Sequence, residues 1–396
     1  MGYGKIGKKV LVFVLYSILV LVITLGTLEF LLRAKILKND TAEALTQARW
    51  RDVGYIYTHF PYDTINVKDE RGESILVKTD RFGLRNEDSI YDGQVKHKIL
   101  VLGDSFTEAS ATPHEYTLVS RLNEFAKNNG YDVSFINGGL DGYGNWQSFL
   151  LLDSVYQKMK PDVVILMACL GNDLRDNYLM TKPVAGTMQN VVQRDKNETV
   201  HILNNPKEKV VMRRRAKAFI RNNIVGKSYI LKILYAYIAA FGQQAKPEIA
   251  YDYFRTESYK NIPRQFVLDA GKKTDFIFHS FKEYCDKRGI RLIVFLIPSK
   301  IEVFDEIFFT TPEQKRLVLD LIKDPNGYDV KNPIRYFKTA AENNGVTFVD
   351  MTPFFEEHSK EKVFGVVDFH WSRLGQALAA SFVFDTLVKD KYLEKN

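Results

Sequence analysis

The chain has 396 residues, 55 of them lysine or arginine and 48 aspartate or glutamate, and its formal net charge is +7. A hydrophobic content of 45% and an aromatic content of 13% exclude a largely disordered chain, and the length allows one large or two ordinary domains. The densest basic cluster, residues 213–217, is typical of a solvated helix face or of weak contact with anionic lipid headgroups. We therefore expect no nucleic-acid partner.

The cysteine and histidine pattern argues against a metal site. Cys169 and Cys285 each lie in or beside an apolar pattern and are expected to be buried free thiols. The seven histidines are scattered, and no Cys/His spacing is typical of zinc. The sequence predicts neither a metal site nor a cofactor.

Residues 1–40 are expected to form a membrane anchor. The run from Val10 to Leu32 holds 23 residues and one charge, Glu29. At about 1.5 Å per residue, a helix of this length spans a hydrocarbon core of about 30 Å. A cleaved signal peptide has a shorter apolar region followed by a small-residue cleavage site, which is absent here. The pattern predicts an uncleaved, single-pass transmembrane signal anchor.

The orientation of this anchor follows less directly, because lysines or arginines flank the run on both sides. We expect the amino terminus inside and the rest of the chain extracellular or periplasmic, since long carboxyl-terminal domains translocate largely regardless of charge. The inverted topology stays open.

Residues 41–96 form a second expected unit. Apolar and polar residues alternate at Ser74–Lys78 between turn signals, which predicts a membrane-proximal segment with a small β-hairpin. Nothing in its residue pattern indicates a reaction.

Residues 97–396 alternate between short apolar runs and helical patterns, which indicates βαβ units and a mostly parallel sheet. The five expected strands are Ile99–Leu102, Val133–Ile136, Val163–Met167, Leu292–Leu296 and Thr347–Val349. The expected helices are Tyr116–Asn128, Asn145–Lys158, Lys273–Lys287, Pro312–Ile322, Ile334–Glu342 and Leu374–Leu387. These elements predict a three-layer α/β/α domain.

The rhythm breaks at about residues 176–263, which we expect to form a helical insertion that covers the functional site. Within it, Ser228–Phe241 is strongly apolar but only 14 residues long. A run this short favours a core-packed or membrane-surface helix over a membrane span.

A serine stands at the end of the first expected strand. Gly103-Asp104-Ser105 follows the apolar run Ile99–Leu102 directly. An open α/β sheet places its chemistry at the carboxyl ends of its strands, so Ser105 is a candidate nucleophile. The same triplet is also an ordinary turn composition.

Two further segments follow the second and third expected strands and hold candidate oxyanion donors. Gly142 lies in the glycine-rich stretch 137–144, which could turn a backbone N–H toward a reacting carbonyl or serve only as a turn. Asn172 in Gly171-Asn172-Asp173 could donate its amide to an oxyanion, or form a helix N-cap or an Asx turn.

The fourth segment is Asp368-Phe369-His370-Trp371, just ahead of the last expected helix. In an extended stretch residues two apart point to the same side, so Asp368 and His370 can face one pocket. There His370 would act as general base and Asp368 would orient it. The alternative is a surface turn whose aspartate caps the helix. All four segments lie directly after separate expected strands or directly before a helix. Chance is a poor explanation for this shared placement.

Together the four segments resemble the SGNH subgroup of the GDSL-type serine esterases and lipases. The resemblance implies a flavodoxin-like fold and roles for five residues: Ser105 as nucleophile and backbone oxyanion donor, Gly142 and Asn172 as further oxyanion donors, and Asp368 and His370 as acid and base. One residue separates Asp368 from His370, whereas the family usually has two; this spacing resembles polysaccharide acetyltransferases and esterases related to the group. The anchor, ending in Glu-x-x-x-Arg, resembles that of bacterial anchored members.

The function implied is a membrane-anchored serine esterase that hydrolyses or transfers an acyl group, preferably acetyl, on an envelope or extracellular carbohydrate. The sequence does not separate hydrolysis from transfer, since both use the same residues. A lipid or lysophospholipid esterase of the same mechanism is one alternative, motivated by Ser228–Phe241. A non-catalytic envelope scaffold protein that keeps the fold is the other.

Overall fold

The computed structural model describes residues 16–17, 19–30, 51–52, 56–69, 72–91, 95–179, 192–194, 200–202, 251–303, 326–365 and 370–393. The chain divides into two compact units, Met1–Arg51 with Val191–Gln244, and Asp52–Asn190 with Ala245–Asn396. In the first unit, residues 16–17 and 19–30 are helical, and β8 (Val192–Arg194) pairs antiparallel with β9 (Val200–Ile202).

The predicted membrane span, residues 10–32, falls only partly within the described residues. In the described part of the chain, no helix combines the length and the apolar character needed to cross a bilayer. The expected helix at residues 312–322 and the apolar stretch at residues 228–241 lie outside the described residues.

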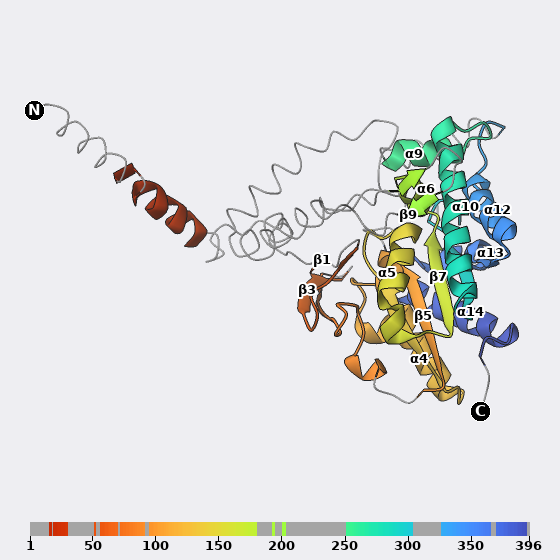
Figure 1. The fold of residues 1–396 in the computed structure, drawn as a ribbon, viewed down its shortest axis with the longest axis horizontal. Helices are drawn as coiled ribbons and strands as arrows, with labels where there is room; N and C mark the ends of the chain where they lie inside the picture. The colour runs from red at the N-terminus through yellow and green to blue at the C-terminus, as the bar shows by residue number, and fades with distance from the viewer. Residues whose placement is uncertain are drawn as a thin grey trace, which may run out of the picture. The chain divides into compact units, whose positions relative to one another are not determined.

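A five-stranded parallel sheet forms the centre of the second unit (Figure 1). Its strands are β5 (His97–Gly103), β6 (Val133–Gly139), β7 (Val163–Cys169), β10 (Arg291–Ile297) and β11 (Thr347–Asp350), in the order β11-β10-β7-β5-β6. Each contains one predicted strand and extends it by one to three residues at an end. The three central strands are buried almost throughout, which explains their uninterrupted apolar runs.

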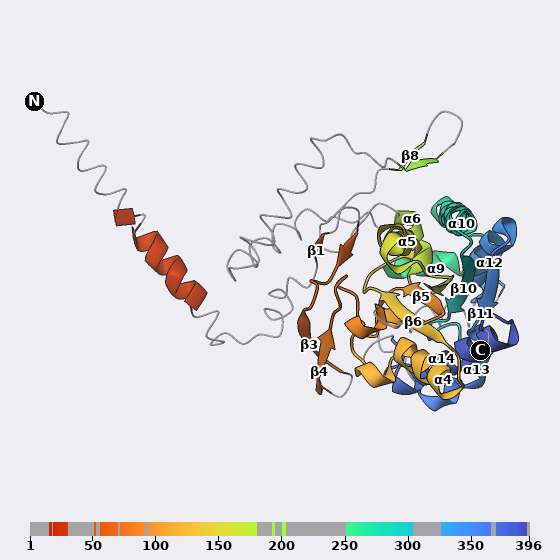
Figure 2. The same cartoon turned by 60° about the horizontal axis from the view of Figure 1, so that its bottom comes forward.

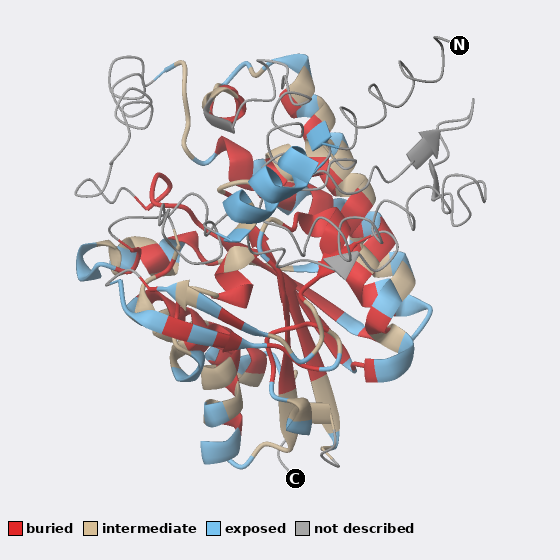
Figure 3. Cartoon of the chain, turned by 90° about the vertical axis from the view of Figure 1, so that its left-hand side faces the viewer, coloured by how far each residue is buried: buried red, intermediate tan, exposed pale blue. Residues whose placement is uncertain are grey.

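Helices cover both faces of this sheet, as the three-layer prediction requires (Figure 2). One layer contains α4 (Leu118–Asn128), α13 (Thr352–Glu357) and α14 (Arg373–Lys389); the other contains α5 (Asn145–Met159), α10 (Gln265–Asp286) and α12 (Asn332–Asn344). Figure 3 shows the buried residues concentrated in the sheet and on the helix faces turned toward it. Within the sheet, the chain visits the strands in the flavodoxin-like order, which confirms the predicted three-layer α/β/α domain but not the predicted transmembrane helix.

Several short elements complete the second unit. The helices α3 (Ser105–Glu108) and α6 (Asp173–Leu179) follow β5 and β7, and α9 (Tyr251–Ser258) precedes α10. The remaining elements are β2 (Tyr57–Thr58) and the 3-10 helices η1 (Asp88–Tyr91), η2 (His114–Tyr116) and η7 (Ser359–Glu361). The two residues of β1 (Arg51–Asp52) are divided between the two units. The predicted hairpin is present as β3 (Thr64–Lys68) paired antiparallel with β4 (Ser74–Lys78).

The segment before the sheet docks on edge strand β6 through Asn86. The buried Asn86 side chain accepts a hydrogen bond from the Asn137 N–H at 2.8 Å and donates to the Asn137 carbonyl at 3.0 Å. It also donates to the Asp80 carboxylate at 2.9 Å. Asn86 thus satisfies backbone groups of an edge strand that another strand would otherwise pair with.

We predict that Asn86→Ala lowers the free energy of unfolding by about 2–4 kcal/mol, because it leaves a buried N–H, a buried C=O and a carboxylate without this partner. Asn343→Ala, which removes one exposed amide bond to Asp275, is the matched control and is expected to change stability by less than about 0.5 kcal/mol. Urea denaturation of the full chain measures both values. Equal effects of the two variants would contradict the docking role of Asn86.

Candidate active site

Ser105 lies at the carboxyl end of the central strand β5 and is the first residue of α3. The Asp104 side chain caps this helix by accepting a hydrogen bond from the Phe106 N–H at 2.9 Å. The neighbours of β5 are β6 on one side and β7 on the other, so the serine lies where the strand order reverses. Open α/β sheets bind ligands at this switch point.

His370 lies against the serine, as the sequence predicts. Its Nε2 is 2.6 Å from the Ser105 Oγ, within the range of a hydrogen bond. Both residues are half-buried, so the pair is accessible to a small substrate. The Phe106 ring centroid is 5.1 Å from that of His370. In this geometry Nε2 can take the hydroxyl proton while the serine attacks.

The backbone around His370 is held on both sides. The Gly365 N–H donates to the His370 carbonyl at 2.8 Å, and the Gly365 carbonyl accepts a hydrogen bond from the buried Lys300 ammonium at 2.6 Å. After His370, the Gln376 side chain accepts from the Leu118 N–H at 2.7 Å and donates to the Phe106 carbonyl at 3.0 Å. These contacts fix the segment around His370 relative to α3, which begins at Ser105.

The predicted acid, Asp368, lies outside the described residues, so its role stays a prediction. Asp104 directly precedes Ser105 in the chain and is buried. Burial raises the pKa of Asp104 to about 6, although the Phe106 N–H and the proximity of His370 act in the opposite direction.

Gly142 lies in a tight turn directly after β6. The Tyr143 N–H donates to the Leu140 carbonyl at 3.1 Å, and Gly142 has φ +74° at the third position of this turn. Such a φ favours glycine. The turn is tied to the nucleophile strand, since the Leu140 N–H donates to the Gly103 carbonyl at 3.1 Å. Gly142 is half-buried and therefore accessible.

Asn172 follows β7 at the same end of the sheet and is also half-buried. Its side-chain amide donates to the Asp176 carboxylate at 3.0 Å. An amide carries two N–H donors, so this bond can orient Asn172 while the other donor serves a substrate oxygen. Burial raises the pKa values of both Asp173 and Asp176 in the helix that begins here.

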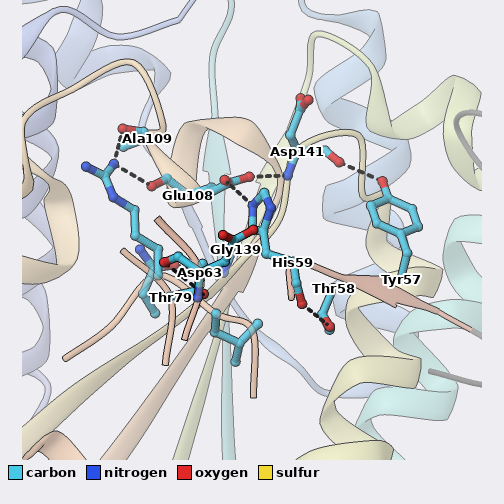
Figure 4. A network of polar contacts seen from close by, with 12 residues as sticks. Tyr57, Thr58, His59, Asp63, Thr79, Glu108, Ala109, Gly139 and Asp141 are labelled. Atoms are coloured by element: carbon cyan, nitrogen blue, oxygen red, sulfur yellow. Dashed lines mark hydrogen bonds and ion pairs between the residues drawn. The ribbon is translucent and has the colours of Figure 1, made fainter. Parts of the chain in front are cut away.

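The sequence analysis missed a buried polar network that joins the segment before the sheet to the candidate site (Figure 4). The His59 Nε2 lies 2.8 Å from Glu108 Oε1, and the other oxygen of Glu108 accepts from the Asp141 N–H. The Arg85 guanidinium donates to the Glu108 carbonyl at 3.0 Å and also to the Ala109 carbonyl. The sequence carried one signal, a glutamate three residues after the candidate nucleophile Ser105.

Burial opposes ionisation of Glu108, but the hydrogen bonds from His59 and the Asp141 N–H hold its pKa below the ordinary value. An ionised carboxylate only accepts, so His59 donates to it. As predicted, Cys169 and Cys285 are buried free thiols. Among the described residues, no group of His, Cys, Asp and Glu side chains is arranged to hold a metal ion.

No protein-family model matches the chain, and no curated protein is significantly similar to it. Solved structures similar to it include an acetyl xylan esterase at 12% identity, covering 73% of this chain and 99% of that one with a TM-score of 0.38. A lipase/acylhydrolase from Enterococcus faecalis has 11% identity, coverage of 76% and 98%, and a TM-score of 0.36. A protein assigned to the lipolytic G-D-S-L family from Desulfitobacterium hafniense has 11% identity, coverage of 73% and 99%, and a TM-score of 0.33.

Proposed function

We propose that this chain is a serine hydrolase that acts on esters. The observation that carries the proposal is the 2.6 Å contact between the His370 Nε2 and the Ser105 Oγ at the switch point of a parallel sheet. A half-buried serine paired with a histidine is the minimal arrangement for nucleophilic acyl transfer.

In the proposed mechanism, the Ser105 Oγ attacks the ester carbonyl carbon while its proton passes to the His370 Nε2. The tetrahedral oxyanion accepts hydrogen bonds from the Ser105 N–H, the Gly142 N–H and the Asn172 amide. His370 then returns the proton to the departing alkoxide, which leaves an acyl group on Ser105. An incoming water, activated by His370, releases the acid. Asp368 would orient His370 and stabilise its cationic form.

The finer proposal is that the ester is an acetyl group on an envelope or extracellular carbohydrate. Its support is the sequence: the close Asp-x-His-Trp spacing and the apolar run at residues 10–32, which we propose anchors the chain in a membrane with the hydrolase domain extracellular or periplasmic. A sugar hydroxyl that replaces water in the second step would make the same residues an O-acyltransferase.

The test is ester hydrolysis by the full chain, purified in detergent, compared with its Ser105→Ala variant. The substrates are p-nitrophenyl acetate, p-nitrophenyl butyrate, an acetylated xylooligosaccharide and a lysophospholipid. We expect hydrolysis that depends on Ser105, fastest for the acetyl esters. Preference for the lysophospholipid would favour a lipid esterase. No hydrolysis, together with no labelling by a fluorophosphonate, would favour a non-catalytic scaffold and overturn the proposal.

A further inference from the structure

The contacts of the Gly142 turn extend the proposed function to a residue outside the sheet. Four residues, Leu140 to Tyr143, form this turn, and the φ of +74° at its third position is that of a type II turn. A type I turn has a negative φ at that position and differs chiefly by a flip of the central peptide, here Asp141–Gly142. The flip would reverse the direction of the Gly142 N–H. Glycine adopts both forms, so its own conformation does not choose between them.

A tyrosine from β2 contacts this central peptide. The buried Tyr57 hydroxyl donates to the Asp141 carbonyl at 2.6 Å (Figure 4). In a planar trans peptide the C=O and the following N–H point in opposite directions. A donor that fixes the Asp141 carbonyl therefore also fixes the Gly142 N–H on the other side of the peptide plane.

The tyrosine ring is held independently of its hydroxyl. The ring centroids of Tyr57 and Tyr143 are 5.0 Å apart in an edge-to-face arrangement, and the Tyr143 hydroxyl donates to the Tyr57 carbonyl. Burial raises the pKa of Tyr57 above its ordinary value, so the phenol keeps its proton and remains a donor.

A second contact holds the preceding peptide of the same turn. The Asp141 N–H donates to the Glu108 carboxylate, which is itself bonded to His59. Both peptides flanking Asp141 are thus fixed by buried side chains, those of Tyr57 and Glu108. Tyr57, and His59 that bonds Glu108, come from residues 56–69, before the sheet begins.

We propose that Tyr57 is a positioning residue for the oxyanion hole, whose hydroxyl holds the Asp141–Gly142 peptide in the orientation that presents the Gly142 N–H to the substrate. This inference rests on the proposed function. It gives the segment before the sheet, for which the sequence indicated no chemistry, a direct part in the arrangement of the site.

The test is Tyr57→Phe in the full chain, which removes one hydroxyl and keeps the ring. We expect kcat for p-nitrophenyl acetate to fall about 10- to 100-fold, with KM changed less than about two-fold, because the oxyanion donor matters most in the transition state. The matched control is Tyr91→Phe, which removes a hydroxyl bonded to Asp80 in the same segment. Tyr91→Phe is expected to keep the wild-type kcat.

A crystal structure of Tyr57→Phe supplies a readout that does not depend on catalysis. We expect the Asp141–Gly142 peptide to be flipped or present in two orientations. A wild-type peptide orientation, or a wild-type kcat, would overturn the inference. If the wild-type chain shows no hydrolysis that depends on Ser105, the proposed function fails, and the peptide orientation in the variant still decides whether Tyr57 positions the turn.

Discussion

His370→Ala is expected to lower kcat for ester hydrolysis by at least about 10³-fold, because the Ser105 hydroxyl then loses the base that accepts its proton. The pair is joined by the 2.6 Å contact, so the variant removes the acceptor without touching the nucleophile. Rates of p-nitrophenyl acetate hydrolysis and of fluorophosphonate labelling measure the effect. Both should fall together, since both need an activated serine.

The control for this variant is His358→Ala. The His358 ring is bonded to the Phe354 carbonyl at 2.8 Å, within its own helical segment. We expect His358→Ala to keep wild-type kinetics. Fluorophosphonate labelling that remains rapid in His370→Ala would show that another group activates Ser105 and would refute the assignment of the base.

Gly139→Ala is expected to destabilise the chain by about 3 kcal/mol or more and to abolish hydrolysis. A Cβ at Gly139 would lie 2.3 Å from the Glu108 nitrogen and 2.6 Å from the Thr107 Cβ. The obstacle includes backbone of α3, so relief requires this helix to move, and Ser105 is its first residue. Thermal unfolding and hydrolysis rates measure the two effects.

Gly130→Ala is the control that separates this steric clash from the general cost of replacing a glycine whose φ is positive. A Cβ at Gly130 has no neighbour within 4 Å, and the only penalty there is its φ of +73°. We expect a loss of about 1 kcal/mol and unchanged kinetics. A Gly139→Ala variant as stable and active as Gly130→Ala would mean that β6 and α3 do not approach each other as described.

The strands and the central pair of the site could be predicted from sequence because their signals are local. Buried parallel strands read as continuous apolar runs, and Ser105 follows one of them directly. His370 was recognisable because it stands before a long apolar helix, with an aspartate two residues earlier. Such features require no knowledge of distant partners.

The hydrogen bonds that hold the site in place could not be predicted, because each joins residues that are far apart in the sequence. Tyr57 contacts the Asp141 carbonyl 84 residues later, and Asn86 contacts Asn137, 51 residues later. The sequence of this segment shows only alternating apolar and polar residues between turn signals. Its hairpin was therefore predicted correctly, while its contribution to the site was not.

The start of α10 was predicted eight residues too late for a different reason. Gly271 lowers helix propensity and interrupts the pattern between Gln265 and Lys273. In the fold, a Cβ at this position would lie 2.5 Å from the Tyr336 ring of α12. Close packing of two helices, which the local sequence does not reveal, accounts for the glycine and for the longer helix.

The order of the strands has a consequence for biosynthesis. Because synthesis runs from the amino terminus, β5, which precedes Ser105, is made before its two neighbours β6 and β7 and before β10 and β11. His370 and the bonds of Gln376 to Leu118 and Phe106 come only afterwards. A nascent chain that ends at Asp350 already contains every strand of the five-stranded sheet but lacks His370, the proposed base for Ser105. In the proposed mechanism, acyl transfer therefore requires the carboxyl-terminal segment that carries His370.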